Sequence, residues 1–589
     1  MQLRPPVPDE VIVSSARRAR RLVGALAVPA VTALVVAAAV TVRIRYLDSQ
    51  SYWSDEVFSV NQARVDIPQV LDIGATEVHT PLYALLLHGW IALGGGSAAT
   101  VWTHALSGVF GLLAMVVSWT GLRRTGLTTR VRWVAVAVVA ANGFGIVYAQ
   151  ESRPYGLALL GAVGVTAATA SATAALLDRR RPRWELWVCW ASLAATAHLL
   201  GAVLVGVAGA VLVAVALAVH RWWQALLAPA VVFGALAPQL AWLVVHGRNQ
   251  PGFAGGTHWI APAVPQDLLD LLTSTFAAGD LATTAGGYVW RSTTGLAVAG
   301  ALLLVALLAA AGGGVAAAVR TRTSPVPPDG DSRGPSAEGA VTVSRRYEGP
   351  LFAEEPHRDR VLALVLLVLA VLTGAATYVV SQTVHVWTLR NMIVVVPAVV
   401  WGVSWLVCAA PPWRRGRQLA ALAVLGASAA ALVPISAALE KPYKTDFRSA
   451  LLHLARMRAE QPQATFSFFG GGPVAALVAT DRPLDDPQLL NIWDKVDPHR
   501  RPTWAIASLR RLPGPQAVLF YTGMSGRDDD AVAAQILGQL ADPGCNRVPV
   551  HGVVLVTCPG EGTTDGGVST DGTGVSPGRA ARAGSPVRG

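Results

Sequence analysis

The stretch ELWVCWASLAATAHLLGAVLVGVAGAVLVAVALAV, residues 185–219, contains a single Asp, Glu, Lys or Arg residue, Glu185. About 20 apolar residues are enough for an α-helix to cross the roughly 30 Å hydrocarbon core of a bilayer. This run is too long for one crossing, and we divide it near His198 and Gly201 into two helices joined by a turn. It predicts a protein built from hydrophobic helices that span a membrane.

Similar apolar runs recur along the chain. Of its 589 residues, 53% are hydrophobic and 14% are charged, whereas a soluble domain has about 25% charged residues. We expect an α-helical polytopic membrane protein with about eleven transmembrane helices. The first run follows an arginine cluster and is interpreted as an uncleaved span. The candidate spans are 22–42, 97–120, 133–149, 154–177, 185–199, 201–219, 225–245, 294–319, 361–380, 391–409 and 419–437.

The arginines orient these spans, because cytoplasmic loops carry an excess of Arg and Lys. The net charge of +11 comes almost entirely from arginine, and most arginines flank apolar runs, so no nucleic-acid partner is implied. With eleven spans, every cluster falls on one side, which we take as cytoplasmic. The chain is then a multi-pass plasma-membrane protein with a cytoplasmic N-terminus and an extracytoplasmic C-terminus. The outer side receives 43–96, 150–153, 198–201, 246–293, 381–390 and everything after 438.

The polar segments complete the domain plan. A cytoplasmic N-terminus, 1–21, precedes a transmembrane domain, 22–437, which includes a cytoplasmic loop, 321–358, expected to be disordered. Residues 438–558 alternate helix-like stretches (447–458, 531–540) with strand-like ones (465–469, 518–521, 553–556), which predicts a small extracytoplasmic α/β domain. The Gly- and Ser-rich tail, 559–589, is expected to be disordered.

The four cysteines fall into two pairs. Cys189 and Cys408 lie within apolar runs and are expected to be inert packing residues. Cys545 and Cys558 flank a predicted strand in the extracytoplasmic domain. Since disulfides persist in oxidising compartments, we predict that these two are bonded.

The outer loop after the first span contains YWSDEVFS, residues 52–59, with two adjacent carboxylates. Ser54 is a suitable helix N-cap, which would place Asp55 and Glu56 in the first turn, where the helix dipole favours them. Capping alone would explain this pattern. Alternatively, one carboxylate is the general base toward a hydroxyl acceptor. Adjacent helical residues point about 100° apart, so the two are expected to have different roles.

The same loop continues with EVHTPLY, residues 77–83. Thr80 and Pro81 predict the start of a short helix lying at the membrane interface. His79 either makes a capping or interfacial hydrogen bond or contacts a ligand or phosphate.

A second outer turn reads YAQESRPY, residues 148–155. Glu151 and Arg153 there either form an ion pair with each other or serve a function, and charge at membrane depth favours function. His198 is equally consistent with a hydrogen-bonded bundle histidine and with a ligand contact. Arg390 either extends to the interface or holds a phosphate, which suits its guanidinium fork.

The order and common sidedness of three motifs, 53–56, 79–83 and 150–155, resemble the GT-C superfamily, in particular its family-39-like bacterial members. These are polytopic glycosyltransferases that use polyprenyl-phosphate sugars. KTDFR, residues 444–448, also resembles the segment that opens their outer C-terminal domain. Thr80 stands where proline is common and Ser152 where alanine is common.

The resemblance implies inverting transfer of a sugar, mannose-type, from a polyprenyl-phosphate donor in the bilayer to an extracytoplasmic glycan, lipid or protein acceptor. It implies that Asp55 and Glu56 are catalytic, with Asp55 deprotonating the acceptor hydroxyl. Arginines, with or without a divalent cation, would stabilise the leaving phosphate. The implied substrate-binding residues are His79, Tyr83, Glu151, Arg153, Tyr155, His198 and Arg390.

Other functions remain open. A transfer of arabinofuranose or an aminosugar would use the same fold. A transporter, flippase or ligase of cell-envelope lipids is the competing class, but many transporters show repeated halves, and this sequence instead places its charges at the outer membrane edge. A non-catalytic homologue is disfavoured by the presence of Asp55.

Overall fold

The structure of the chain is a computed structural model. It describes residues 9–75, 80–97, 99–246, 262–276, 280–284, 287–291, 356–411, 413–441 and 443–444. Beyond these it describes the C-terminal strands given below and the single positions 260, 449, 453, 456, 459, 460 and 538.

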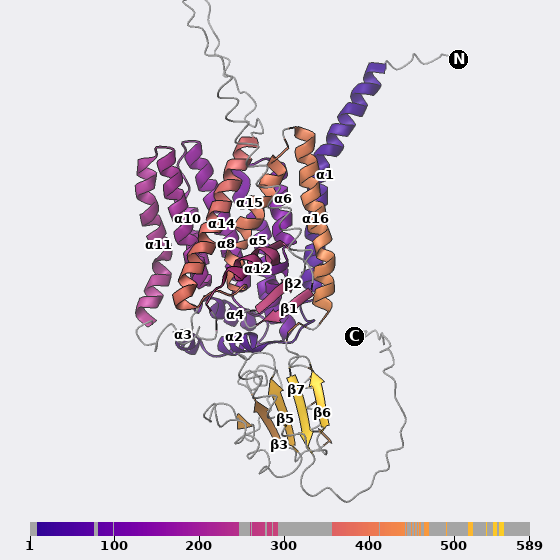
Figure 1. The fold of residues 1–589 in the computed structure, drawn as a ribbon, viewed down its shortest axis with the longest axis vertical. Helices are drawn as coiled ribbons and strands as arrows, with labels where there is room; N and C mark the ends of the chain where they lie inside the picture. The colour runs from indigo at the N-terminus through magenta and orange to yellow at the C-terminus, as the bar shows by residue number, and fades with distance from the viewer. Residues whose placement is uncertain are drawn as a thin grey trace, which may run out of the picture.

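Long helices packed side by side form the body of the molecule (Figure 1). In the described part of the chain, seven are long and apolar enough to cross a membrane, or eight if one bent pair is a single span. This confirms the predicted polytopic helical class. The helices of the bundle are α1 (Asp9–Arg45), α5 (Thr100–Gly121), α6 (Thr129–Ala140), α7 (Gly143–Val147), α8 (Tyr155–Leu177), α9 (Trp184–Ala197), α10 (Leu199–Ala218), α11 (Trp222–His246), α14 (Pro356–Val384), α15 (Val396–Ala409) and α16 (Arg414–Glu440).

Two predicted spans are more irregular than expected. The run 133–149 is a broken helix, in which α6 is followed by α7 and the 3-10 turn η2 (Tyr148–Gln150) after a bend of 54°. Asn142 stabilises the break, because its side chain caps α7 through Gly145 N (3.1 Å) and donates to Thr275 O (3.0 Å). The run 391–409 begins as the 3-10 turn η4 (Asn391–Val394) before α15. The predicted span 294–319 lies outside the described residues.

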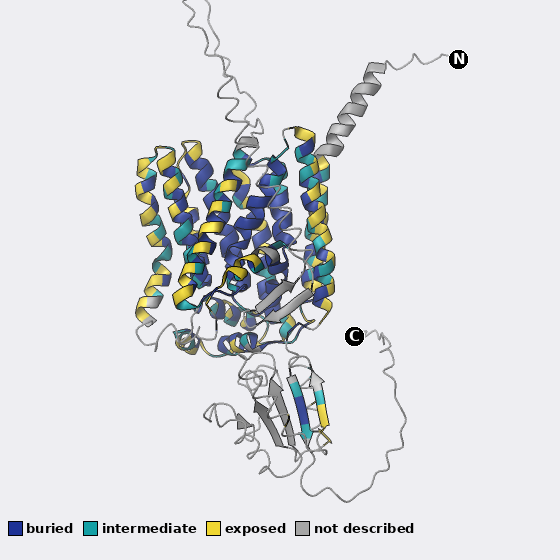
Figure 2. Ribbon diagram, in the orientation of Figure 1, coloured by how far each residue is buried: buried dark blue, intermediate teal, exposed yellow. Residues whose placement is uncertain are grey.

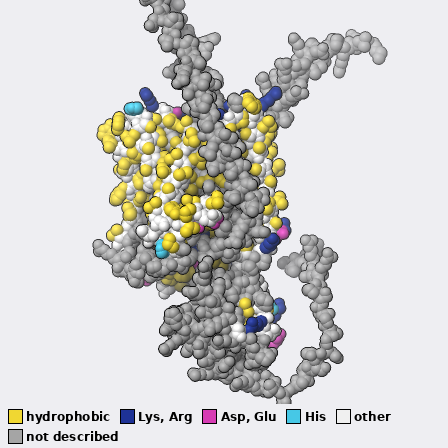
Figure 3. All heavy atoms as spheres, viewed as in Figure 1, with side chains coloured by type: hydrophobic (Ala, Val, Ile, Leu, Met, Phe, Trp, Pro, Cys, Tyr) yellow, Lys and Arg dark blue, Asp and Glu magenta, His cyan; other side chains and the backbone are white. Residues whose placement is uncertain are grey.

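Helix α8 lies at the centre of the bundle, with 94% of its most apolar window buried, compared with 22% for α11 at the edge (Figure 2). Small residues allow the close packing of α8. A Cβ added at Gly161 would lie 2.7 Å from Ala194 Cα of α9, so glycine permits this approach. Hydrophobic side chains cover the visible outer face of the bundle (Figure 3).

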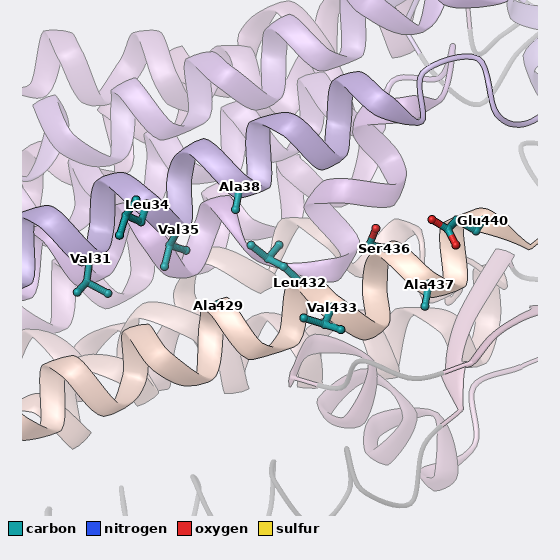
Figure 4. A pocket seen from close by; sticks show the side chains of 10 residues that line it. All are labelled: Val31, Leu34, Val35, Ala38, Ala429, Leu432, Val433, Ser436, Ala437 and Glu440. Atoms are coloured by element: carbon teal, nitrogen blue, oxygen red, sulfur yellow. The ribbon is translucent and has the colours of Figure 1, made fainter.

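An apolar groove of about 640 Å³ runs between α1 and α16 (Figure 4). Val35 and Leu432 are among its lining residues, and Ser436 and Glu440 give it a polar end. At that end Glu440 accepts hydrogen bonds from Tyr46 (2.8 Å) and from Arg45 (3.1 Å).

The segments predicted to share a side of the membrane do meet at the same end of the bundle. At one end Arg358 binds Asp178 (2.8 Å) and Thr125 O (2.7 Å), which joins three predicted cytoplasmic segments. The opposite end carries the short helices α2 (Ser54–Arg64), α3 (Ile67–Ala75), α4 (Leu82–Leu93) and α12 (Pro265–Phe276), and the hairpin of β1 (Asp280–Thr284) and β2 (Gly287–Arg291) (Figure 1).

A five-stranded mixed sheet follows in sequence. Its order is β4-β3-β5-β7-β6, with β3 parallel to β4 and β5, and β7 antiparallel to β5 and β6. The three predicted strands are confirmed as β3 (Thr465–Phe469), β5 (Gln516–Tyr521) and β7 (Val553–Cys558), and β4 (Leu490–Asn491) and β6 (Asn546–Val550) complete the sheet. Only isolated positions of the two predicted helices are described.

Candidate active site

The site begins at the first turn of α2, which contains Asp55 and Glu56 as predicted. The N-cap is Trp53 rather than Ser54, and its backbone N–H donates to Glu56 Oε2 (3.3 Å). Because neighbouring helical side chains diverge, the two carboxylates enter different surroundings. The side chain of Asp55 is 20% exposed, whereas that of Glu56 is fully buried.

Asp55 is held between two arginines from distant parts of the chain. Its Oδ2 lies 3.0 Å from Arg390 Nη1 and 3.5 Å from Arg153 Nη2. Arg153 also donates to the Asp55 carbonyl oxygen (3.2 Å) and to Ser59 Oγ (2.9 Å). Both guanidinium groups are largely buried. Two cations therefore converge on one partly exposed carboxylate.

Aromatic residues form one side of this arginine pair. The Arg390 guanidinium lies 5.1 Å from the Trp53 ring centroid and 5.9 Å from that of Tyr155. The Tyr155 ring lies 6.0 Å from that of His198. His198 Nδ1 accepts from Leu200 N (3.2 Å), so Nε2 carries the proton that is donated to Asn391 Oδ1 (3.2 Å). His198 is thus a neutral histidine that fixes the turn adjoining Arg390.

The buried carboxylate of Glu56 accepts hydrogen bonds from four donors. Besides Trp53 N, they are Lys444 Nζ (2.9 Å), Ser152 N (2.9 Å) and His104 Nε2 (2.6 Å). Burial alone would raise the pKa of Glu56, but Lys444 and His104 outweigh it and lower the pKa to about 2. An enclosed, fully bonded carboxylate suits positioning better than the direct catalysis that the resemblance implied for Glu56.

Glu151 lies close to Glu56, because Lys444 contacts both carboxylates. The Glu151 carboxylate is fully buried and forms an ion pair with Lys444 (3.7 Å), rather than the mutual ion pair with Arg153 that the sequence left open. Within the described part of the chain, neither of its carboxylate oxygens accepts a hydrogen bond. Burial raises the pKa of Glu151 to about 7, despite the opposing effect of Lys444.

The remaining predicted residues lie further away or outside the described residues. Tyr83 is buried and contacts Ser107 Oγ (3.3 Å), which in turn donates to Glu151 O (2.6 Å), so Tyr83 supports the 150–153 turn from behind. Thr80 donates to Thr196 O and joins α4 to α9. His79 lies outside the described residues, as does the predicted disulfide, since Cys545 and the side chain of Cys558 are not described.

Sequence reasoning missed two buried members of the site, Lys444 and His104. Lys444 is one of three lysines in the chain and opens a segment that resembled the start of the outer domain. His104 is an ionisable residue within a predicted span, which is by default a functional signal. Either observation was sufficient to mark the residue for attention.

The described residues contain no group of three His, Cys, Asp or Glu side chains arranged to hold a metal ion. Three cations, Arg153, Arg390 and Lys444, surround the carboxylates instead. The donor set described here therefore fits an anionic ligand.

Comparison with known proteins agrees with this architecture. No protein-family model and no curated protein sequence matches the chain. Among solved structures, that of ArnT from Cupriavidus metallidurans bound to undecaprenyl phosphate matches with a TM-score of 0.50 and 14% sequence identity, over 89% of this chain and 97% of that chain. The apo structure of ArnT gives a TM-score of 0.49 over the same shares. The chain therefore has the helical membrane fold of ArnT, a GT-C glycosyltransferase.

Proposed function

We propose that this protein is a polyprenyl-phosphate-dependent GT-C glycosyltransferase that transfers a sugar, with inversion, to an acceptor outside the cytoplasm. The observation that carries the proposal is the partly exposed Asp55 carboxylate, paired with two largely buried arginines at one end of a membrane helix bundle. This arrangement combines a base with a binding site for an anion.

In the proposed reaction Asp55 accepts the proton of an acceptor hydroxyl. The acceptor oxygen forms a bond to the anomeric carbon, the bond from that carbon to the phosphate oxygen breaks, and its electron pair stays on the phosphate. Arg153 and Arg390 stabilise the charge that develops on the departing polyprenyl phosphate. In the structure these arginines pair with Asp55, so a bound phosphate would take over the arginines and release Asp55 to act as a base.

Two observations support a lipid-linked donor. The ArnT structure with the same fold was solved with undecaprenyl phosphate, a polyprenyl phosphate. The arginine pair lies at the end of the helix bundle, between η4, α2 and the turn before α8. A phosphate there could bind the arginines while its isoprenoid chain stays in the bilayer.

The proposal is tested with purified protein in lipid nanodiscs. Radiolabelled polyprenyl-phosphate mannose, which the resemblance favours, arabinofuranose and an aminosugar are each supplied with lipids from the source membranes as acceptor. We expect transfer from one of these donors, loss of transfer in Asp55→Asn, and none in the absence of enzyme. Asp72→Asn, an equivalent change at an exposed position on α3, is the matched control. If the protein transfers sugar from none of these donors, the proposal is contradicted.

The proposed orientation places this end of the bundle outside the cytoplasm. Reporter fusions after Arg132 and Arg181 should report the cytoplasm, and a fusion after Glu440 should report the exterior. A cytoplasmic signal from the last fusion would place the site on the wrong side for an extracytoplasmic acceptor.

A further inference from the structure

Lys444, just after the last helix of the bundle, is fully buried beside the proposed site. Lysine is almost never fully buried without a partner, because removing its charge from water is costly. Its Nζ donates to Glu56 Oε2 (2.9 Å) and Gln150 O (3.2 Å) and lies 3.7 Å from Glu151 Oε1. Gln50 Oε1 accepts its backbone N–H (3.4 Å) and secures the turn.

The hydrogen bonds around Glu56 also determine the charge of His104. Its Nδ1 lies 2.7 Å from Leu47 O, and its Nε2 lies 2.6 Å from Glu56 Oε1. A carbonyl oxygen and a carboxylate oxygen can only accept. Both ring nitrogens therefore carry protons and His104 is an imidazolium, consistent with the ionised state of Glu56.

Glu56, His104, Lys444 and Glu151 thus form a buried quartet of two acidic and two basic groups. With Glu151 ionised, the quartet is electrically neutral, as a buried charge cluster must nearly be. With Glu151 protonated, it carries one positive charge. The quartet can therefore change its net charge by one proton, and Glu151 is the member that changes.

The quartet joins the two segments that supply the proposed catalytic groups. Glu56 directly follows Asp55 on α2. Ser152 N, bonded to Glu56 Oε1 (2.9 Å), directly precedes Arg153. Lys444 adds the bond to Gln150 O on the same turn. The contacts of Glu56 with Ser152 and Lys444 therefore hold these two segments together, in addition to the direct contacts of Arg153 with Asp55 and Ser59.

We infer that Lys444 is a positioning residue, which completes the charge balance of this quartet and so holds the Asp55 carboxylate and the Arg153 guanidinium in register. The inference rests on the proposed function. It also assigns a role to the segment after α16, whose lysine completes a site otherwise built from the bundle and its outer loops.

The inference predicts a pH dependence through Glu151. The charged and titratable groups that act on Glu151 from the surrounding elements are Lys444, Glu56, Arg390, Arg153, Tyr155 and Tyr443. Of these, Lys444 does most to lower its pKa, which is about 7 in the intact site. Without Lys444, the pKa of Glu151 rises. At low pH a protonated Glu151 compensates for the missing cation, whereas at high pH the site must either hold an uncompensated carboxylate or bind a proton against the bulk pH.

The test compares the kcat and the donor KM of Lys444→Met, Lys444→Arg and the double variant Lys444→Met/Glu151→Gln at pH 6 and 8.5. Lys441→Met, an exposed lysine three positions away, is the matched control. We expect Lys444→Met to lower kcat about 100-fold at pH 8.5, the scale of a misplaced catalytic group, and less at pH 6. The ratio of variant to wild type cancels titrations common to both proteins. Lys444→Arg should recover part of the loss.

The double variant removes one cation and one acid, so it should fold, and its kcat relative to the wild type should be reduced by the same factor at both pH values. A Lys444→Met enzyme with wild-type kcat at pH 8.5, or a deficit independent of pH, would overturn the inference. If Lys444→Met does not accumulate as folded protein, the double variant tests the inference in its place. If the double variant also fails to fold, the proposed charge balance of the quartet is wrong. Asp55→Asn is assayed alongside. If the wild-type protein transfers sugar from none of the donors, the proposed function fails, whereas a fully active Asp55→Asn refutes only the assignment of Asp55 as the base. If Asp55→Asn is inactive while Lys444→Met is normal, only this inference fails.

Discussion

Replacing Asp55 by asparagine is the most direct perturbation of the proposed site. The change is nearly isosteric, and the remaining amide oxygen can still accept the bond that Arg390 Nη1 now donates at 3.0 Å. The helix start is held by Glu56 and Trp53 and should be unaffected. The substitution therefore removes the basicity and the negative charge of residue 55 and leaves the local geometry in place.

Two effects of opposite sign follow. Loss of a general base lowers kcat by about 10²–10⁴-fold, or roughly 3–5 kcal/mol in the activation barrier. Donor binding should move the other way. At an effective dielectric constant of about 20, the gross attraction of Asp55 to each arginine is about 5 kcal/mol at the observed 3.0 and 3.5 Å. A donor phosphate must compete with that attraction, so Asp55→Asn should bind it as tightly as the wild type or more tightly.

The assay measures single-turnover transfer and, separately, equilibrium binding of a polyprenyl phosphate to the same preparations. Asp72→Asn again controls for the loss of a carboxylate on the same outer loop. Weaker binding with an unchanged rate would show that Asp55 acts in donor binding and not as a base. An unchanged rate together with unchanged binding would remove Asp55 from the site altogether.

The remaining predictions concern the cations, the pH response and the disulfide. Arg390→Met and Arg153→Met should each raise the Kd for polyprenyl phosphate about tenfold or more, because a charge-assisted hydrogen bond is lost, as measured by binding in detergent. Since the pKa of Glu151 is raised from 4.5 to about 7, its contribution to stability is fully present below pH 4.5 and is lost as the pH rises through 7. The free energy of unfolding should fall by about 3 kcal/mol over this range in the wild type but not in Glu151→Gln, and thermal unfolding at pH 5 and 8 measures the difference. If Glu151→Gln loses as much stability as the wild type between these pH values, the prediction is wrong. Thiol labelling of the denatured protein without reductant should leave Cys545 and Cys558 unmodified, and labelling of both would exclude the bond.

Much of the fold could be predicted because membrane spans are encoded locally. Length and hydropathy mark helices such as α8 and α10, and a helix satisfies all its backbone hydrogen bonds within one segment. The division of 185–219 at His198 is confirmed, since α9 ends at Ala197 and α10 starts at Leu199. The arginine pattern also grouped the loops correctly, as the contacts of Arg358 with Asp178 and Thr125 show.

The irregular parts were not predictable in this way. The bend between α6 and α7 depends on Asn142 and its contact with Thr275, a residue 133 positions away. The start of α2 was displaced by one residue, because the Glu56 side chain caps the backbone N–H of Trp53. Neither contact has a signature in the hydrophobic pattern from which the spans were read.

By itself, the sequence determined the membrane class, the grouping of the loops and the candidate residues Asp55, Arg153 and Arg390, because each signal lies within one short segment. Only the tertiary structure decided the roles within the acidic pair. Adjacent helical side chains diverge, but which one meets solvent depends on neighbours 48 and 388 residues away, His104 and Lys444. Two buried cations cost least in free energy when they face a buried anion. Glu56 is therefore enclosed, and Asp55 is left at the surface between the arginines.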